Sequence, residues 1–134
     1  MKIVNKPSPN YDTKRYRKIK YIIIHYTGME SAKASIRRLR DKKSKVSCHY
    51  FIDEKGSLSR LVDDKNVAWH AGASFWNSDK SLNKNSIGIE VQNKGEPSCY
   101  EKFKSKQIQI LIELILDLQN KYNINNYHIL GHSD

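Results

Sequence analysis

The stretch Asn85-Ser86-Ile87-Gly88-Ile89-Glu90-Val91-Gln92 decides how this chain is expected to fold. Apolar residues alternate in it with small or polar ones, which predicts a strand over 86–92 with one apolar face. The two faces are Ile87, Ile89 and Val91 on one side, and Gly88, Glu90 and Gln92 on the other. An isolated charge inside such a strand is costly, so Glu90 is expected to be paired, bound to a ligand or used in chemistry.

Outward from this strand, the pattern predicts two strand–helix–strand units. Residues 105–122 form an amphipathic helix with a broad apolar stripe, and 127–130 form a strand, so 86–130 is expected to be a crossover unit with parallel strands. The stripe comprises Ile108, Leu111, Ile112, Ile115 and Leu118, widened by Ile110, Leu114 and Leu116, and its breadth predicts burial on more than one side. A strand, a helix and a strand are also predicted over 21–26, 31–43 and 46–53, either as another crossover or as a looser α/β unit.

The rest of the chain is predicted to form a hairpin strand, an N-terminal arm and a loop around this α/β core. Residues 57–62 are expected to return as a hairpin partner after a turn over 53–56. Residues 1–19 are polar, with Pro7 and Pro9, and predict an arm around the domain. Residues 63–85 predict a long loop, a feature that is usually functional in a small domain.

Length and composition favour one globular domain of 134 residues. No apolar run has the roughly 18 residues of a membrane span, and no signal sequence is visible at the N-terminus, so a cytoplasmic location is slightly favoured over a periplasmic one. The net charge of +10 indicates either a polyanionic partner or compositional bias. Cys48 and Cys99 are either two thiols or one bridge.

Two histidines occupy places where α/β proteins collect ligands. His25 lies near the end of the 21–26 strand and His132 just past the 127–130 strand, so both are expected at carboxyl ends of strands. Two imidazoles there could share a zinc ion, which acidifies water to a pKa of about 7, and Glu90 could move the proton. The alternatives remain open at this point: strand-end histidines are commonly hydrogen-bonded core residues, and Glu90 could pair with a lysine.

Several motifs in order along the chain resemble one family, the type-2 N-acetylmuramoyl-L-alanine amidases. These zinc enzymes cut the amide between the lactyl group of N-acetylmuramic acid and L-alanine. The likeness is closest to the branch with the cytosolic anhydro-muropeptide amidase and its outer-membrane lipoprotein relative. It rests on Ser8-Pro9-Asn10-Tyr11, Ile22-Ile23-Ile24-His25-Tyr26-Thr27, Val46-Ser47-Cys48-His49-Tyr50, Ala68-Trp69-His70-Ala71-Gly72, Leu82-Asn83, Ser86-Ile87-Gly88-Ile89-Glu90 and Gly131-His132-Ser133-Asp134.

The resemblance implies a fold, a substrate and roles for single residues. The fold is a single α/β domain over 1–134, with a mixed central β-sheet flanked by helices. The substrate partner is peptidoglycan or a muropeptide. Cys48 stands at the position where short phage amidases have a tyrosine. This difference favours the branch of the family whose catalytic residue is a glutamate. The implied roles are zinc ligation by His25 and His132, catalysis by Glu90, and substrate binding by Trp69, His70, Ala71 and Asn85.

One part of the family pattern is missing from the sequence. The family places an aspartate zinc ligand, with an oxyanion-stabilising lysine or arginine just before it, beyond the Gly-His-Ser-Asp motif. The chain is therefore expected to lack the C-terminal end of the family domain, and the alternative function is a weak or inactive remnant that only binds cell-wall fragments. If its side chain faces the site, Cys48 could supply a thiolate to zinc in place of the missing aspartate, which is a minor alternative. No nucleic-acid partner is expected, because aromatic residues other than Tyr16 do not interleave with the basic clusters over 14–18 and 37–43.

Overall fold

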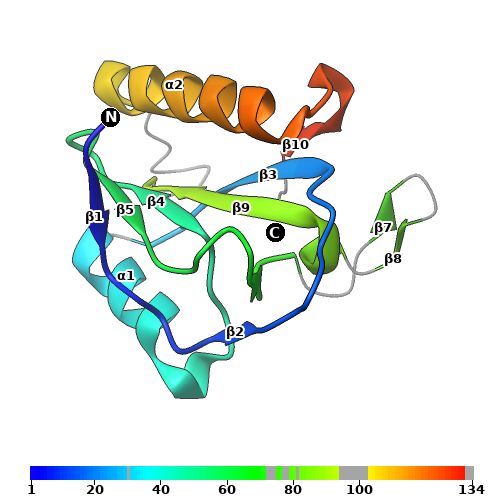
Figure 1. The fold of residues 1–134 in the computed structure, drawn as a ribbon. Helices are drawn as coiled ribbons and strands as arrows, with labels where there is room; N and C mark the ends of the chain where they lie inside the picture. Colours follow the sequence, from blue (N-terminus) through cyan, green and yellow to red (C-terminus); the bar gives the residue numbers. More distant parts are fainter. Residues whose placement is uncertain (30, 72–74, 77–78, 81, 94–102, 132–134) are drawn as a thin grey trace.

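The sheet at the centre of the molecule has six strands in the order β1-β5-β4-β9-β3-β10 (Figure 1). This computed structural model describes residues 1–29, 31–71, 75–76, 79–80, 82–93 and 103–131. The strands are β1 (Ile3–Asn5), β3 (Tyr21–Tyr26), β4 (Tyr50–Ile52), β5 (Leu58–Arg60), β9 (Ser86–Val91) and β10 (Ile129–Gly131). Only the β4–β5 pair is antiparallel, so the sheet is mixed, as predicted.

Two helices and several short elements complete the fold. The helices are α1 (Ala32–Arg40) and α2 (Ser105–Tyr122), and the 3₁₀ turns are η1 (Lys42–Ser44), η2 (Leu82–Asn85) and η3 (Asn126–His128). Two small antiparallel pairs join β2 (Tyr11–Asp12) to β6 (Val67–Ala68) and β7 (Phe75–Trp76) to β8 (Asp79–Lys80). Within the described segments, no helix is both long and apolar enough to span a bilayer.

The predicted crossover unit over 86–130 is confirmed, and the unit over 21–53, left open between a crossover and a looser arrangement, is also a crossover. The chain passes from β3 through α1 to β4 and from β9 through α2 to β10, and all four strands run parallel. The two units interleave in the sheet: β9 lies between β3 and β4, and β3 lies between β9 and β10. This interleaving brings β3 and β9 together at the centre, so the residues at their carboxyl ends become neighbours.

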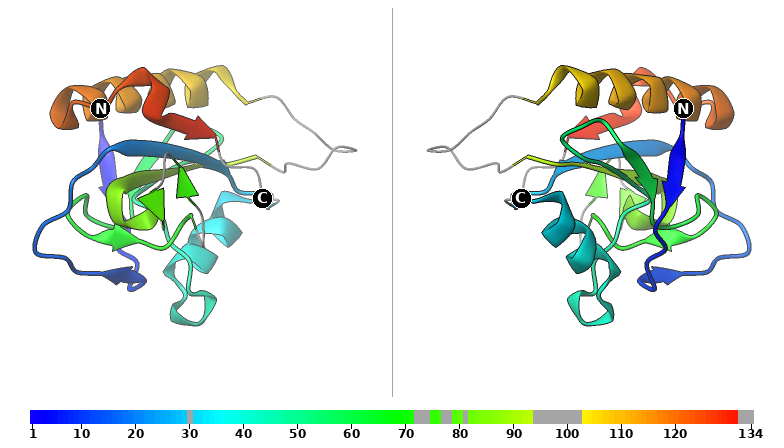
Figure 2. Two further views of the ribbon diagram at one scale, coloured as in Figure 1. Left: turned by 90° about the vertical axis from the view of Figure 1, so that its right-hand side faces the viewer. Right: turned by 90° about the vertical axis from the view of Figure 1, so that its left-hand side faces the viewer.

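The two faces of the sheet carry different layers (Figure 2). Leu114 and Leu118 of α2 pack on one face, against the predicted apolar side of β9. On the other face, Leu39 of α1 packs with Phe51 of β4. Side chains along a strand alternate between faces, so the small and polar side of β9 (Ser86, Gly88 and Glu90) faces the α1 layer.

Some predicted boundaries and one predicted face are wrong. The predicted helix over 31–43 ends at Arg40, because Asp41 is extended and its side chain accepts a hydrogen bond from the Lys43 amide that starts η1. The predicted strands over 46–53 and 57–62 contract to three residues each, and the last strand starts two residues later than predicted. Burial of α2 on more than one side is also wrong, because only one side meets the sheet: Ile108, Ile112 and Leu116 are exposed.

The N-terminal arm is more structured than the sequence indicated. Its β1 strand joins the edge of the main sheet beside β5, and β2 pairs with β6. Farther along, the Arg17 guanidinium donates to the carbonyl oxygens of Asp64 at 2.7 Å and Ser86 at 2.9 Å. The arm therefore fixes the start of β9 and the loop region that precedes it.

Candidate functional site

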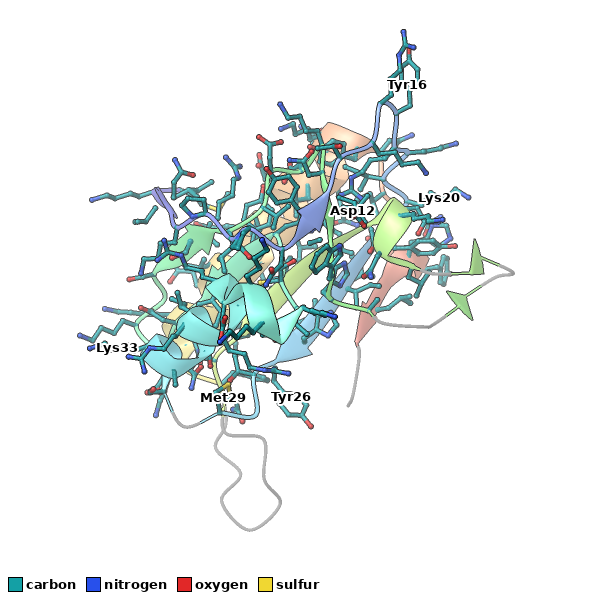
Figure 3. All side chains as sticks on the ribbon, turned by 90° about the horizontal axis from the view of Figure 1, so that it is seen from below. Asp12, Tyr16, Lys20, Tyr26, Met29 and Lys33 are labelled. Carbon is teal, nitrogen blue, oxygen red and sulfur yellow. The ribbon has the colours of Figure 1, made fainter. Side chains whose placement is uncertain are left out.

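A pocket of about 600 Å³ opens on the α1 side of the sheet, the face turned toward the viewer in Figure 3. Its floor holds His25 and Glu90, from β3 and β9. Its walls come from the end of α1 and the segment after it, from the stretch 69–71 and from η2. The lining residues are His25, Arg38, Leu39, Lys45, Val46, Ser47, Trp69, His70, Ala71, Asn83 and Glu90.

The register of β3 and β9 places the two floor residues side by side. His25 pairs with Glu90 across the parallel ladder, so both side chains leave the same face of the sheet. His25 is only 4% exposed, and the imidazole sits at the carboxyl end of a buried strand. An imidazole and a carboxylate are thus held on adjacent rigid strands at one pocket.

His70 completes this row of polar side chains. Its Nδ1 lies 3.0 Å from His25 Nε2, and the two rings meet edge to face with centroids 5.2 Å apart. Gly88 leaves room for the ring: a Cβ built on Gly88 would lie 2.4 Å from His70 Cγ. The absence of a side chain at Gly88 is therefore what allows His70 to reach His25.

Side-chain hydrogen bonds shape the loop that carries Trp69, His70 and Ala71. Asn83 Oδ1 accepts from the backbone amides of His70 at 3.1 Å and Ala71 at 2.7 Å. The Trp69 indole donates to Asp12 Oδ2 of β2 at 3.0 Å. Part of the wall is therefore fixed to η2 and part to the N-terminal arm.

His49 supports the floor from within the protein. Its Nδ1 accepts from the Gly88 amide at 3.0 Å, and Nε2 donates to the Asn66 carbonyl at 2.8 Å. Burial lowers the pKa of His49 from the ordinary 6.5 to about 4, and the charge of Arg17 adds to the effect. His49 is therefore a neutral residue that fixes the middle of β9.

Acid is expected to unfold the protein partly through His49. As the pH falls below 6.5 the unfolded chain binds a proton at this histidine, whereas the folded protein does so only near about pH 4. The unfolded state then holds more protons, so stability is lost as the pH falls through this window, by about 3 kcal/mol in all. Urea unfolding at a series of pH values measures this.

The matched variant is His49→Asn, whose amide oxygen can still accept from the Gly88 amide but does not titrate. It is expected to be less stable than the wild type near neutral pH. The gap between the two proteins should shrink by about 3 kcal/mol on acidification. A gap that stays constant with pH would show that His49 does not carry this dependence.

Cys48 lies behind the floor as a buried thiol. It packs with Leu39, Phe51 and Leu61, and its Sγ donates to the Tyr50 carbonyl at 3.1 Å. Burial raises the pKa of the Cys48 thiol well above its usual range, and the nearby Glu90 charge raises it further. A protonated thiol disfavours the minor idea of a thiolate ligand from Cys48.

Most of the residues predicted for the site line the pocket. His25, Glu90, Trp69, His70 and Ala71 are brought together there. His132 lies outside the described residues. In the part of the chain that is described, no group of three His, Cys, Asp or Glu side chains could hold a metal.

The predicted binding residue Asn85 is placed differently from the others. It ends η2, where its carbonyl accepts from the Lys20 amide at 2.8 Å, and the pocket is lined instead by its neighbour Asn83. A substrate role for Asn85 stays a prediction.

Sequence reasoning missed Asn83, Arg38 and Lys45 as parts of the wall. Arg38 and Lys45 lie in and just after the basic cluster over 37–43. Nothing in the spacing of these residues shows which of them face inward.

Known proteins are similar to this chain in both sequence and architecture. The family model described as N-acetylmuramoyl-L-alanine amidase matches residues 15–134. The amidase AmiD of Escherichia coli is 35% identical over 98% of this chain, which spans 53% of that relative's length.

Solved structures agree with this. A complex of E. coli AmiD with anhydro-N-acetylmuramic acid-L-Ala-D-γ-Glu-L-Lys superposes with a TM-score of 0.79 at 31% identity, covering 93% of this chain and 57% of the other. Pseudomonas aeruginosa AmpDh3 with anhydromuramic pentapeptide gives a TM-score of 0.78 at 27% identity, covering 91% and 54%. The chain belongs to the N-acetylmuramoyl-L-alanine amidase family, Amidase_2.

Proposed function

We propose that this protein hydrolyses the amide between N-acetylmuramic acid and L-alanine in peptidoglycan or muropeptides, with zinc as cofactor. The observation that carries the proposal is the pairing of His25 with Glu90 at the carboxyl ends of two central strands, on the floor of a pocket walled by Trp69 and His70. Family membership supplies the reaction class, and the complexes of AmiD and AmpDh3 with muropeptides supply the class of ligand.

The donor chemistry of the pocket suits zinc. His25 offers an imidazole nitrogen, the commonest kind of ligand at catalytic zinc sites, which take three protein ligands and keep one position open. The last described residue, Gly131, pairs with Ile24, which directly precedes His25, and His132 follows Gly131 in the sequence. The place of His132 in the sequence, directly after a residue that pairs next to His25, supports it as the second ligand. When bound, zinc would polarise the scissile carbonyl and acidify a water molecule.

Glu90 would act on protons in this reaction. A carboxylate beside the zinc site can accept a proton from the attacking water and pass it to the leaving amine of L-alanine. The floor position of Glu90 on a central strand keeps its carboxylate fixed with respect to His25. The proton can therefore move from the attacking water to the leaving amine through Glu90, without a second water molecule.

The pocket walls would select and orient the substrate. Arg38 and Lys45 line the same pocket, so its wall is cationic. A stem peptide carries carboxylates, and opposite charges raise its local concentration at such a wall. Trp69 presents an apolar surface on which a sugar or peptide face can pack.

Release of the stem peptide from purified anhydro-muropeptide tests the proposal. The chain is assayed with zinc, after chelation and after zinc is restored, and the free L-alanine amine is counted. Turnover that is lost with the metal and returns with it is the expected result. Binding of muropeptides without any release would instead identify the protein as a remnant that only binds cell-wall fragments, and no binding at all would remove the proposal.

A further inference from the structure

A chain of hydrogen bonds runs beneath the pocket from the backbone of η2 to His25. Ser86 Oγ lies 2.6 Å from the Leu82 carbonyl oxygen and 3.0 Å from His70 Nε2. His70 Nδ1 in turn lies 3.0 Å from His25 Nε2. Three side chains from separate segments are thus linked to one fixed backbone acceptor.

The donor and acceptor of each hydrogen bond in this series follow from the bond between Ser86 and the Leu82 carbonyl. A carbonyl oxygen can only accept, so the Ser86 hydroxyl gives its one proton to Leu82. Ser86 Oγ must then accept from His70 Nε2–H, which leaves Nδ1 of a neutral His70 as an acceptor. His25 Nε2–H donates to that nitrogen, and the lone pair of a neutral His25 resides on Nδ1.

We propose that Ser86 and His70 are positioning residues that hold His25 in its Nε2–H tautomer, with Nδ1 as the metal-binding nitrogen. An imidazole binds a metal only through an unprotonated nitrogen, and the hydrogen bond at the other nitrogen decides which one that is. The metal itself rests on the proposed function. The tautomer of His25 does not, because it follows from hydrogen bonds within this chain.

The surroundings keep this relay from rearranging. Ser86 is fully buried at the start of β9, and its hydroxyl partner belongs to the backbone four residues earlier. Asn83 holds the backbone of His70, and the bare Cα of Gly88 receives the ring. A histidine held on these sides cannot turn its ring over without breaking several contacts, so the tautomer of His25 is built into the fold.

The direct test is the ¹⁵N spectrum of the histidine side chains in the metal-free protein at neutral pH. The expected result is that Nε2 of His25 shows the shift of a protonated nitrogen and Nδ1 that of an unprotonated one. His70 should show the same tautomer, with Nε2 protonated. A proton on Nδ1 of His25 would overturn the inference, whatever the protein does to muropeptides.

Variants supply a second readout through zinc affinity. Ser86→Ala removes the acceptor for His70, and His70→Phe keeps a ring but removes both nitrogens. Each is expected to weaken zinc binding by roughly 10–100-fold, as loss of an outer hydrogen-bond partner commonly does. In Ser86→Ala the tautomers of both histidines should become mixed. Unchanged affinity together with unchanged tautomers in Ser86→Ala would overturn the inference.

Two further variants separate positioning from general damage. His70→Asn keeps an amide oxygen close to the place of Nδ1, so it should recover part of the zinc affinity that His70→Phe loses. Ser35→Ala removes another buried hydroxyl, which donates to the Ser31 carbonyl, and should leave zinc affinity unchanged. If the wild type binds no zinc, the proposed function fails, and the nitrogen spectrum still decides the tautomer of His25.

Discussion

Replacing Glu90 with glutamine is expected to lower turnover of a muropeptide by at least about 100-fold, the lower range for loss of a general acid–base group. Glutamine has the same shape but cannot take up a proton at this place. Zinc affinity should be unchanged, because the proposed ligands are His25 and His132. The measurements are the rate of stem-peptide release at saturating zinc and the dissociation constant for zinc.

A second carboxylate on the same chain gives the control for this experiment. Glu113 is exposed on α2, which covers the opposite face of the sheet from the pocket. Glu113→Gln makes the same change of charge and should turn over substrate like the wild type. If Glu90→Gln were as active as Glu113→Gln, Glu90 would not be the proton-transfer residue, and the assigned mechanism would be wrong.

Replacing Gly88 with alanine is expected to disable the pocket by moving His70. The added Cβ would lie 2.4 Å from Cγ, 2.6 Å from Nδ1 and 2.7 Å from Cδ2 of that ring. The strand cannot yield, because the Gly88 amide donates to His49 Nδ1 and its carbonyl accepts from the His49 amide. The ring must therefore move, which breaks its contacts with His25 and Ser86.

Both stability and metal affinity should change in Gly88→Ala. Overpacking of this kind costs roughly 1–3 kcal/mol of unfolding free energy. Zinc affinity should fall roughly 10–100-fold as the outer partner of His25 is displaced. Gly131→Ala is the control for stability, because no described residue lies within 4 Å of a Cβ built at Gly131 in β10. Equal stability of the two variants would show that His70 does not occupy the space beside Gly88.

The central elements of the fold could be predicted from short-range patterns. Strands over 21–26 and 86–92 and the helix over 105–122 follow from the β-branched run, the period of two and the helical period in the sequence, and the structure has all three nearly at the predicted bounds. Boundaries near Asp41 could not be predicted as well, because side-chain hydrogen bonds at the end of α1 compete with another helical turn.

The candidate site was predicted only in part. His25, Glu90, Trp69 and His70 stand out because of their chemistry within motifs, and they do line the pocket. No motif or unusual chemistry in the sequence singles out Arg38, Lys45 or Asn83. They join the pocket because α1 and η2 pack on the same face of the sheet, which is a property of the assembled layers.

The order of elements, the apolar face of β9 and the residue types capable of chemistry can be worked out from the residues alone, because periodicity and residue chemistry are local properties. The pairing of His25 with Glu90 and the link from Ser86 through His70 to His25 depend on the assembled fold. Strand order and register join residues that are dozens of positions apart, and no local pattern encodes which of them meet.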